Sequence, residues 1–143
     1  MHVSFALFAD AANISQEGKL NILGIFDAVQ VGQLPALHPR TSFVLRLKAT
    51  AQDAGVYPLV LRWMNPKGNE LWSSQAELEI GGAPPGSSEL DMPVIVQLDL
   101  PLDVAGEYRM IINIGSQHTA TCTLNVHGAQ APSLPTPHPG IVS

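Results

Sequence analysis

Apolar and polar residues alternate with a period of two along most of the chain. In residues 43–49, Phe43 and Leu45 fall on one side, and Arg46 and Lys48 fall on the other. The same alternation recurs in later segments, at residues 57–63, 72–80, 94–100, 108–114 and 120–126. Because successive side chains of a strand point to opposite faces, these segments predict six strands with one buried and one solvated face.

Two more strands are predicted nearer the N-terminus. The opening strand carries four apolar residues on one side, Val3, Phe5, Leu7 and Ala9. Residues 20–26 are almost continuously apolar, which predicts a strand covered on both faces, or one in which a bulge at Gly24 switches faces. Turn residues separate the segments, and no stretch shows helical periodicity. The pattern predicts an all-β fold, an immunoglobulin-like antiparallel β-sandwich of about eight strands.

Turn lengths predict the register of two hairpins. Either turn that fits residues 65–70 places Trp63 opposite Trp72 on the core side. In the last hairpin, a three-residue turn at 115–117 pairs Met110 with Cys122 and keeps both on the core side. A two-residue turn would mix core and solvent faces, so the odd-length turn is favoured.

The chain changes character near its end. Prolines at 132, 135, 137 and 139 alternate with Ser, Thr, His and Gly, and no charged side chain is present. Such a segment buries too little apolar surface to offset the entropy of ordering it. We expect residues 1–127 to form the β-sandwich domain and residues 128–143 to form a Pro-rich flexible tail.

Charge and cysteine usage exclude several classes of protein. The formal net charge is −5, and only 7 residues are Lys or Arg, which argues against a nucleic-acid partner. No apolar run is long enough to span a membrane, and residues 3–9 lack the preceding cation of a signal peptide. The one cysteine, Cys122, is expected to be a buried thiol. A cytoplasmic protein is expected.

The sequence marks no catalytic, cofactor-binding or metal-binding residue. The 5 histidines are never three or four residues apart, and no nucleophile elbow or phosphate-binding loop occurs. Tyr108 follows the turn at 103–107 as in the tyrosine corner of immunoglobulin-like sandwiches, a structural device. The outward-facing cations Arg46, Lys48 and Arg62 are expected to pair with Glu77 and Glu79 across strands.

A stretch near the N-terminus resembles a known family. Asp10 is followed by a Gly18-Lys19 turn, by Leu-Asn-Ile-Leu-Gly at 20–24 and by Phe26-Asp27. These features are similar to the opening of a family of small bacterial β-sandwich proteins of unknown function with the motif GKLNILGIFD. The Pro35–Pro39 loop and the residues before Tyr108 also fit, and the likeness covers about residues 3–127. The resemblance implies a bacterial source and a β-sandwich, and nothing about chemistry.

The function that these observations favour is a non-catalytic module that assembles with itself or with another protein. Charged residues make up only 13% of the chain, and charge is the usual protection of strand edges and faces. The candidate interaction surface is the uncharged outer side of the last strand, which carries Thr119, Thr121, Thr123 and Asn125. A small-ligand or carbohydrate-binding sandwich is the alternative, and a hydrolase with loop-borne residues is a weaker one.

Overall fold

A computed structural model describes residues 1–82 and 86–128, and the expected tail from residue 129 onward lies outside them. The described residues form nine strands and one short 3-10 helix, η1 (Ala51–Asp53). The strands are β1 (His2–Ile14), β2 (Leu20–Phe26), β3 (Ala28–Val31), β4 (Ala36–Ala49), β5 (Gly55–Met64), β6 (Glu70–Ile80), β7 (Leu90–Leu102), β8 (Gly106–Ile114) and β9 (His118–Gly128). No helix among them has the length and apolar character needed to cross a bilayer.

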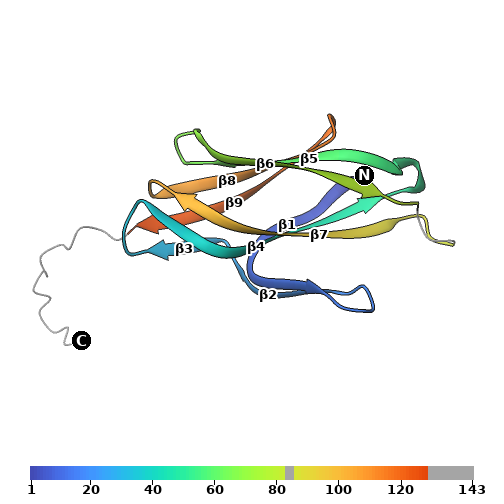
Figure 1. Ribbon diagram of the computed structural model, residues 1–143, viewed down its shortest axis with the longest axis horizontal. Coiled ribbons are helices and arrows are strands. Elements are labelled where there is room, and N and C mark those ends of the chain that lie inside the picture. Colours follow the sequence, from blue (N-terminus) through green and yellow to red (C-terminus); the bar gives the residue numbers. More distant parts are fainter. Residues whose placement is uncertain (83–85, 129–143) are drawn as a thin grey trace, which may run out of the picture.

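The strands form two sheets that face each other (Figure 1). One sheet has the order β2-β1-β4-β7, and the other has the order β3-β9-β8-β5-β6. This arrangement confirms the predicted β-sandwich. Strands β1, β4 and β7 in one sheet face β5, β8 and β9 in the other, in the positions of the immunoglobulin strands A, B and E and the strands C, F and G. The ninth strand, β3, was not predicted. It pairs in parallel with the end of β9, so that the second sheet is mixed rather than antiparallel throughout.

The core lies between the sheets and is built from the alternating inner residues of both. Phe8, Phe43, Trp63 and Tyr108 are its fully buried aromatic residues. Trp63 packs its ring edge-on against Phe8 and stacks on Tyr108, with ring centroids 5.8 and 5.1 Å apart. Its indole N–H donates to the carbonyl of Pro101 at 2.9 Å, so the one polar atom of this side chain is satisfied in the core.

Both predicted registers are confirmed. Trp63 lies opposite Trp72 in the β5–β6 pair, and Met110 lies opposite Cys122 in the β8–β9 pair. The two tryptophans are not equally buried, because β6 is the outer strand of its sheet. Trp63 is fully buried, whereas Trp72 is only half-buried against the rim of the core.

The predicted inner side of the opening strand is wrong beyond Val3. A bulge between Val3 and Phe5 shifts the pairing of β1 with β4. A one-residue shift exchanges the two faces of a strand, so that Ala6 and Phe8 point to the core in place of Phe5 and Leu7.

The tyrosine corner is present. The Tyr108 hydroxyl lies 2.6 Å from the carbonyl oxygen of Val104 and 2.8 Å from Asp103 Oδ1. It also accepts hydrogen bonds from the backbone N–H groups of Asp103 and Val104. Asn65 donates to the same carboxylate at 2.8 Å, which ties the β5–β6 turn to the corner. Desolvation raises the pKa of Tyr108. This cluster closes one end of the sandwich and is structural.

The outward cations are paired, although not with the expected residues. Arg46 lies 2.9 Å from Asp91 on the neighbouring strand β7, and Arg62 lies 2.7 Å from Glu70 on β6. Arg46 and Arg62 lie on different sheets, so no single row of glutamates reaches both. Glu77 and Glu79 were therefore the wrong partners.

The unequal burial of the tryptophans generates a prediction for stability. Trp63→Ala removes a fully buried ring and is expected to cost about 3–5 kcal/mol of unfolding free energy. Trp72→Ala removes a half-buried ring and should cost about half as much, since the lost transfer energy scales with buried area. Urea unfolding of the two variants and the parent measures both costs. Equal costs would contradict the placement of Trp72 at the rim.

Candidate interaction surface

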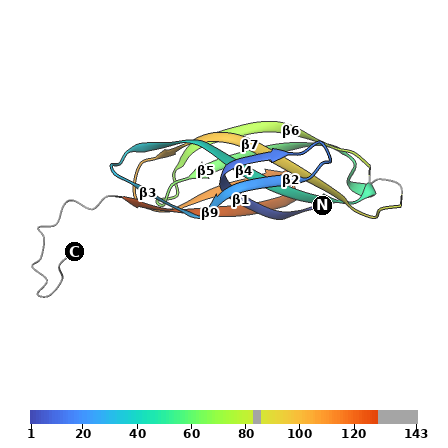
Figure 2. The same cartoon turned by 90° about the horizontal axis from the view of Figure 1, so that it is seen from below.

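Strand β4 is covered on both of its faces. Five consecutive residues, from Thr41 to Leu45, are buried, although alternate residues of a strand point to opposite sides. The inner face packs in the core. The hairpin of β1 and β2 lies across the outer face, because β1 bends after it leaves β4 at Ala9 and the chain returns beneath the sheet (Figures 1 and 2). At the tip of the hairpin, Lys19 and Leu20 line a shallow depression together with Arg46 of β4 and Pro93 of β7.

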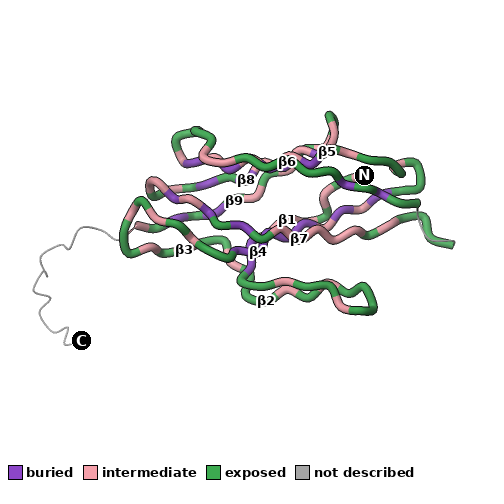
Figure 3. The backbone as a smooth tube through the Cα atoms, viewed as in Figure 1, coloured by how far each residue is buried: buried purple, intermediate pink, exposed green. Residues whose placement is uncertain are grey.

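The two sides of β2 differ in burial. Leu20, Ile22 and Phe26 are half-buried, whereas Leu23 and Ile25 are 72% and 62% exposed. The sequence predicted cover on both faces or a switch of faces at Gly24. Both expectations are wrong, because the pairing with β1 runs through Gly24 without a shift and the covered side stays the same. The hairpin therefore presents large aliphatic residues to solvent, and much of its backbone is coloured as exposed in Figure 3.

A close approach of Asp10 to Gly24 joins the two strands of the hairpin where they leave the main sheet. Gly24 has a φ of +70°, a conformation that favours glycine. A Cβ built on Gly24 would fall on the carboxylate of Asp10, at 2.9 Å from its Cγ. A residue without a side chain is therefore required here, for both its backbone conformation and its space.

The outer strands of the two sheets differ in how they are protected against pairing. β7 carries Pro93, Pro101, Asp91 and Asp99, and β6 carries glutamates at 70, 77 and 79. Prolines and charges are the usual protection of a free edge, because they prevent another strand from adding to it. β3 has only four residues. β2, by contrast, is an edge strand of seven residues with no charge and no proline.

The structure places the predicted surface on β9 outside the core. Thr119, Thr121, Thr123 and Asn125 are all exposed on one face. The last strand was a candidate contact if it lay at an edge, and β9 is a free edge only in part, because β3 pairs with it from Asn125 onward. Nearer the start of β9, the Cys122 thiol donates a hydrogen bond to the carbonyl of Ala6 at 3.4 Å, so β1 lies close to this part of β9.

The neighbours of these four residues are not uncharged. Glu107 and Arg109 of β8 lie directly opposite Asn125 and Thr123. Asn125 also lines an open depression with Gln30, Glu107 and His127. The threonines thus form a polar face with charges beside it. The hairpin, which we did not predict as a contact, carries three of the five exposed large aliphatic residues of the described chain. The nearly continuous apolar run at residues 20–26 was the signal that could have marked it.

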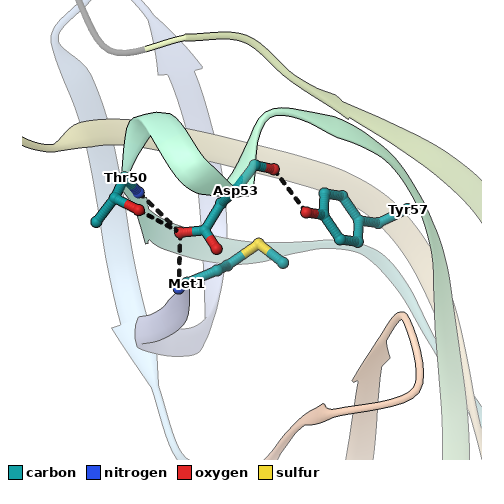
Figure 4. Close-up of polar contacts among 4 residues, drawn as sticks. All are labelled: Met1, Thr50, Asp53 and Tyr57. Atoms are coloured by element: carbon teal, nitrogen blue, oxygen red, sulfur yellow. Dashed lines mark hydrogen bonds and ion pairs between the residues drawn. The ribbon is translucent and has the colours of Figure 1, made fainter.

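Met1, the residue before β1, forms a polar cluster with Thr50, Asp53 and Tyr57 (Figure 4). The ammonium group of Met1 lies 2.8 Å from Asp53 Oδ2, which also accepts the backbone N–H and the hydroxyl of Thr50. The Tyr57 hydroxyl donates to the carbonyl of Asp53 at 2.6 Å. Hydrogen bonding to the ammonium group, and then to the N–H of Thr50, lowers the pKa of Asp53 to about 2. These contacts hold the residue before β1 against η1 and are structural.

Other reactive groups are scattered. Among the described residues, no three His, Cys, Asp or Glu side chains gather in a way that could hold a metal ion. Cys122 is half-buried, and its burial raises the pKa of the thiol to about 11, so that the thiolate is scarce at neutral pH. The geometry offers surfaces for contact with another molecule.

These observations define the protein as a β-sandwich with an extra hairpin layer and an exposed aliphatic edge. A family model described as Family of unknown function (DUF6941) matches residues 4–127, and the chain belongs to this family. The match covers every described strand almost completely, including the β1–β2 hairpin. A comparison with curated proteins found no match.

The contact between Asp10 and Gly24 generates a test of the hairpin. Gly24→Ala is expected to lower the unfolding free energy by about 1–2 kcal/mol for the left-handed backbone alone, and by more because Asp10 must move. Gly18→Ala is the matched control, since Gly18 has a φ of +82° and open space around its Cα. Urea unfolding that gave equal losses for the two variants would contradict the close packing of Asp10.

The lowered pKa of Asp53 predicts a pH dependence. The carboxylate has a lower pKa in the folded state than its ordinary value of 3.8, so its charge stabilises the fold above about pH 4, and this contribution is lost as the pH falls toward 2. Asp53→Asn should therefore melt below the parent at pH 7, and the gap should close near pH 2. Glu77→Gln, on the exposed face of β6, is the control for a lost charge. A gap that stayed constant with pH would refute the pairing with Met1.

Proposed function

We propose that this protein is a non-catalytic module that assembles with itself or with a protein partner, and that β2 is the strand through which it assembles. The observation that carries the proposal is an edge strand that lacks every protective charge and proline and has Leu23 and Ile25 on its solvent side. Such a strand offers unpaired N–H and C=O groups for the addition of another strand, and its side chains add apolar contact.

The neighbouring features support assembly over ligand binding. The exposed large hydrophobic residues of the described chain are all aliphatic, Trp63 and Tyr108 are buried, and Trp72 is half-buried, so none of the described aromatic side chains is exposed as a sugar-binding platform usually is. The depressions in the described surface are open, and the largest one brings a single carboxylate near a single histidine. The setting that we propose is the bacterial cytoplasm, in line with the low cysteine content and with the resemblance noted above.

Substitution of the exposed hairpin residues tests the proposal. A Leu23→Ser, Ile25→Ser variant should lose assembly while its unfolding free energy stays within about 0.5 kcal/mol of the parent, because both side chains are already exposed. Sedimentation velocity measures self-association, and retention of a purified partner measures binding to another protein. A Leu37→Ser, Val56→Ser variant is the matched control, because these residues are 59% and 62% exposed elsewhere.

A second variant distinguishes assembly through β2 from assembly through β9. Thr121→Lys, Thr123→Lys adds charge to the outer face of β9 and should leave assembly intact. Loss of assembly in this variant, with none in the serine variant, would move the contact to β9. A parent that stays monomeric at high concentration and binds no protein would contradict assembly altogether and favour the ligand-binding alternative.

A further inference from the structure

We propose that the strand added to β2 is β2 of a second copy, paired antiparallel about a twofold axis at Leu23. This inference rests on the proposed function and names its partner. Oligomers of identical chains are mostly closed by a twofold axis, and an antiparallel pair of identical edge strands has that symmetry.

The charges that flank β2 select this register. In an antiparallel pair centred on Leu23, residues equally far before and after Leu23 lie opposite each other across the axis. Lys19 of one copy then meets Asp27 of the other, and the twofold axis repeats the contact at the far end. Between these two ion pairs, each strand contributes only the uncharged residues of β2, from Leu20 to Phe26.

Neighbouring registers lose this match. A twofold axis moved to Ile22 places Glu17 opposite Asp27, which brings like charges together at both ends. An axis moved to Gly24 places Lys19 opposite an apolar residue, Val29. Either one-residue move also takes Leu23 off the axis and away from its own copy.

The burial of the side chains agrees with the same axis. Leu23, the most exposed large hydrophobic residue of the described chain, lies on the axis and packs against its own copy. Ile25 lies opposite Asn21 of the other copy. Asn21 lines a shallow, mostly apolar depression of the hairpin together with Ala11 and Leu23, which leaves room for the incoming aliphatic side chain. Pairing thus brings the two exposed aliphatic residues of β2 into contact with the second copy.

The flanking charges can be engaged at little cost. Lys19 lies 3.1 Å from Glu17, but both side chains are 75% exposed, and such surface pairs contribute little. Asp27 lies where the chain leaves one sheet for the other, and its carbonyl, rather than its carboxylate, is held by the N–H of Asn125. A copy with a net charge of −5 is repelled by another copy, so a contact between copies needs an interface that is uncharged or locally paired.

Charge reversal tests the register with the full-length chain. Lys19→Asp places two carboxylates together at each end of the pair, and Asp27→Lys places two ammonium groups together. Each variant alone should self-associate about tenfold or more weakly than the parent. Mixed together, they should form a heterodimer near the parent affinity, because every end then holds one charge of each sign. The double variant Lys19→Asp, Asp27→Lys should also recover self-association. Lys67→Asp and Glu77→Lys carry the same charge changes elsewhere and should behave as the parent does.

A cysteine at the axis tests the geometry directly. Directly opposed residues of an antiparallel pair have Cα atoms about 4.5–5.5 Å apart, which is within reach of a disulfide. In a Cys122→Ala background, Leu23→Cys should oxidise to a covalent dimer, whereas Leu37→Cys and Val56→Cys, of similar exposure, should remain monomeric on a denaturing gel.

The outcomes separate this inference from the proposed function. Rescue by mixing, together with selective crosslinking at position 23, supports the paired strands. A parent dimer that tolerates both charge reversals overturns the β2 pairing, while sensitivity to the Leu23→Ser, Ile25→Ser variant would still support assembly through the hairpin. A parent that is monomeric at every concentration overturns the second copy as the partner, and binding of another protein that depends on Leu23 would then leave the proposed function standing.

Discussion

The burial of β4 on both faces is the constraint on which the rest of the molecule depends. A two-layer sandwich leaves the outer face of each sheet in water, yet Ser42 and Val44 are as deeply buried as Phe43 and Leu45. The hairpin of β1 and β2 supplies the missing layer (Figure 2). The half-buried side of the hairpin, with Leu20 and Ile22, faces the body of the protein. The opposite side necessarily faces solvent, and it is apolar.

This arrangement separates stability from assembly. The core, the tyrosine corner and the cluster at Met1 hold the two main sheets, and none of them needs the exposed side of the hairpin. The edges of β6 and β7 carry the charges and prolines that prevent further pairing. The edge of β2 carries none, which makes it the place where the sheet can grow. Leu23 and Ile25 of β2 are exposed in the single chain, and we propose that they contact another chain.

Strand positions and registers followed from the sequence because they depend on local alternation and on turn length. Trp63 and Trp72 were paired correctly on that basis, and so were Met110 and Cys122. The side of β1 that faces the core could not be predicted, because a one-residue bulge near Ser4 leaves no mark in the pattern. Likewise, the sequence could not decide whether the last strand is an edge, because it does not reveal that the short strand β3 returns to pair with β9. The strand that we propose as the contact, β2, could not be chosen from the sequence for a related reason. An apolar run indicates that a strand is covered, and only the bend after Ala9 decides which of its sides is covered.

Hydrogen exchange of the β2 amides tests most directly whether this strand is the assembling edge. Alternate N–H groups of Leu20–Phe26 point away from β1 and are open to water in a single chain. We predict that these amides become protected in the assembled state, while the outward amides of β6 and β7 exchange as before. Protection that is confined to β9, or that is unchanged by assembly in every edge strand, would contradict the account.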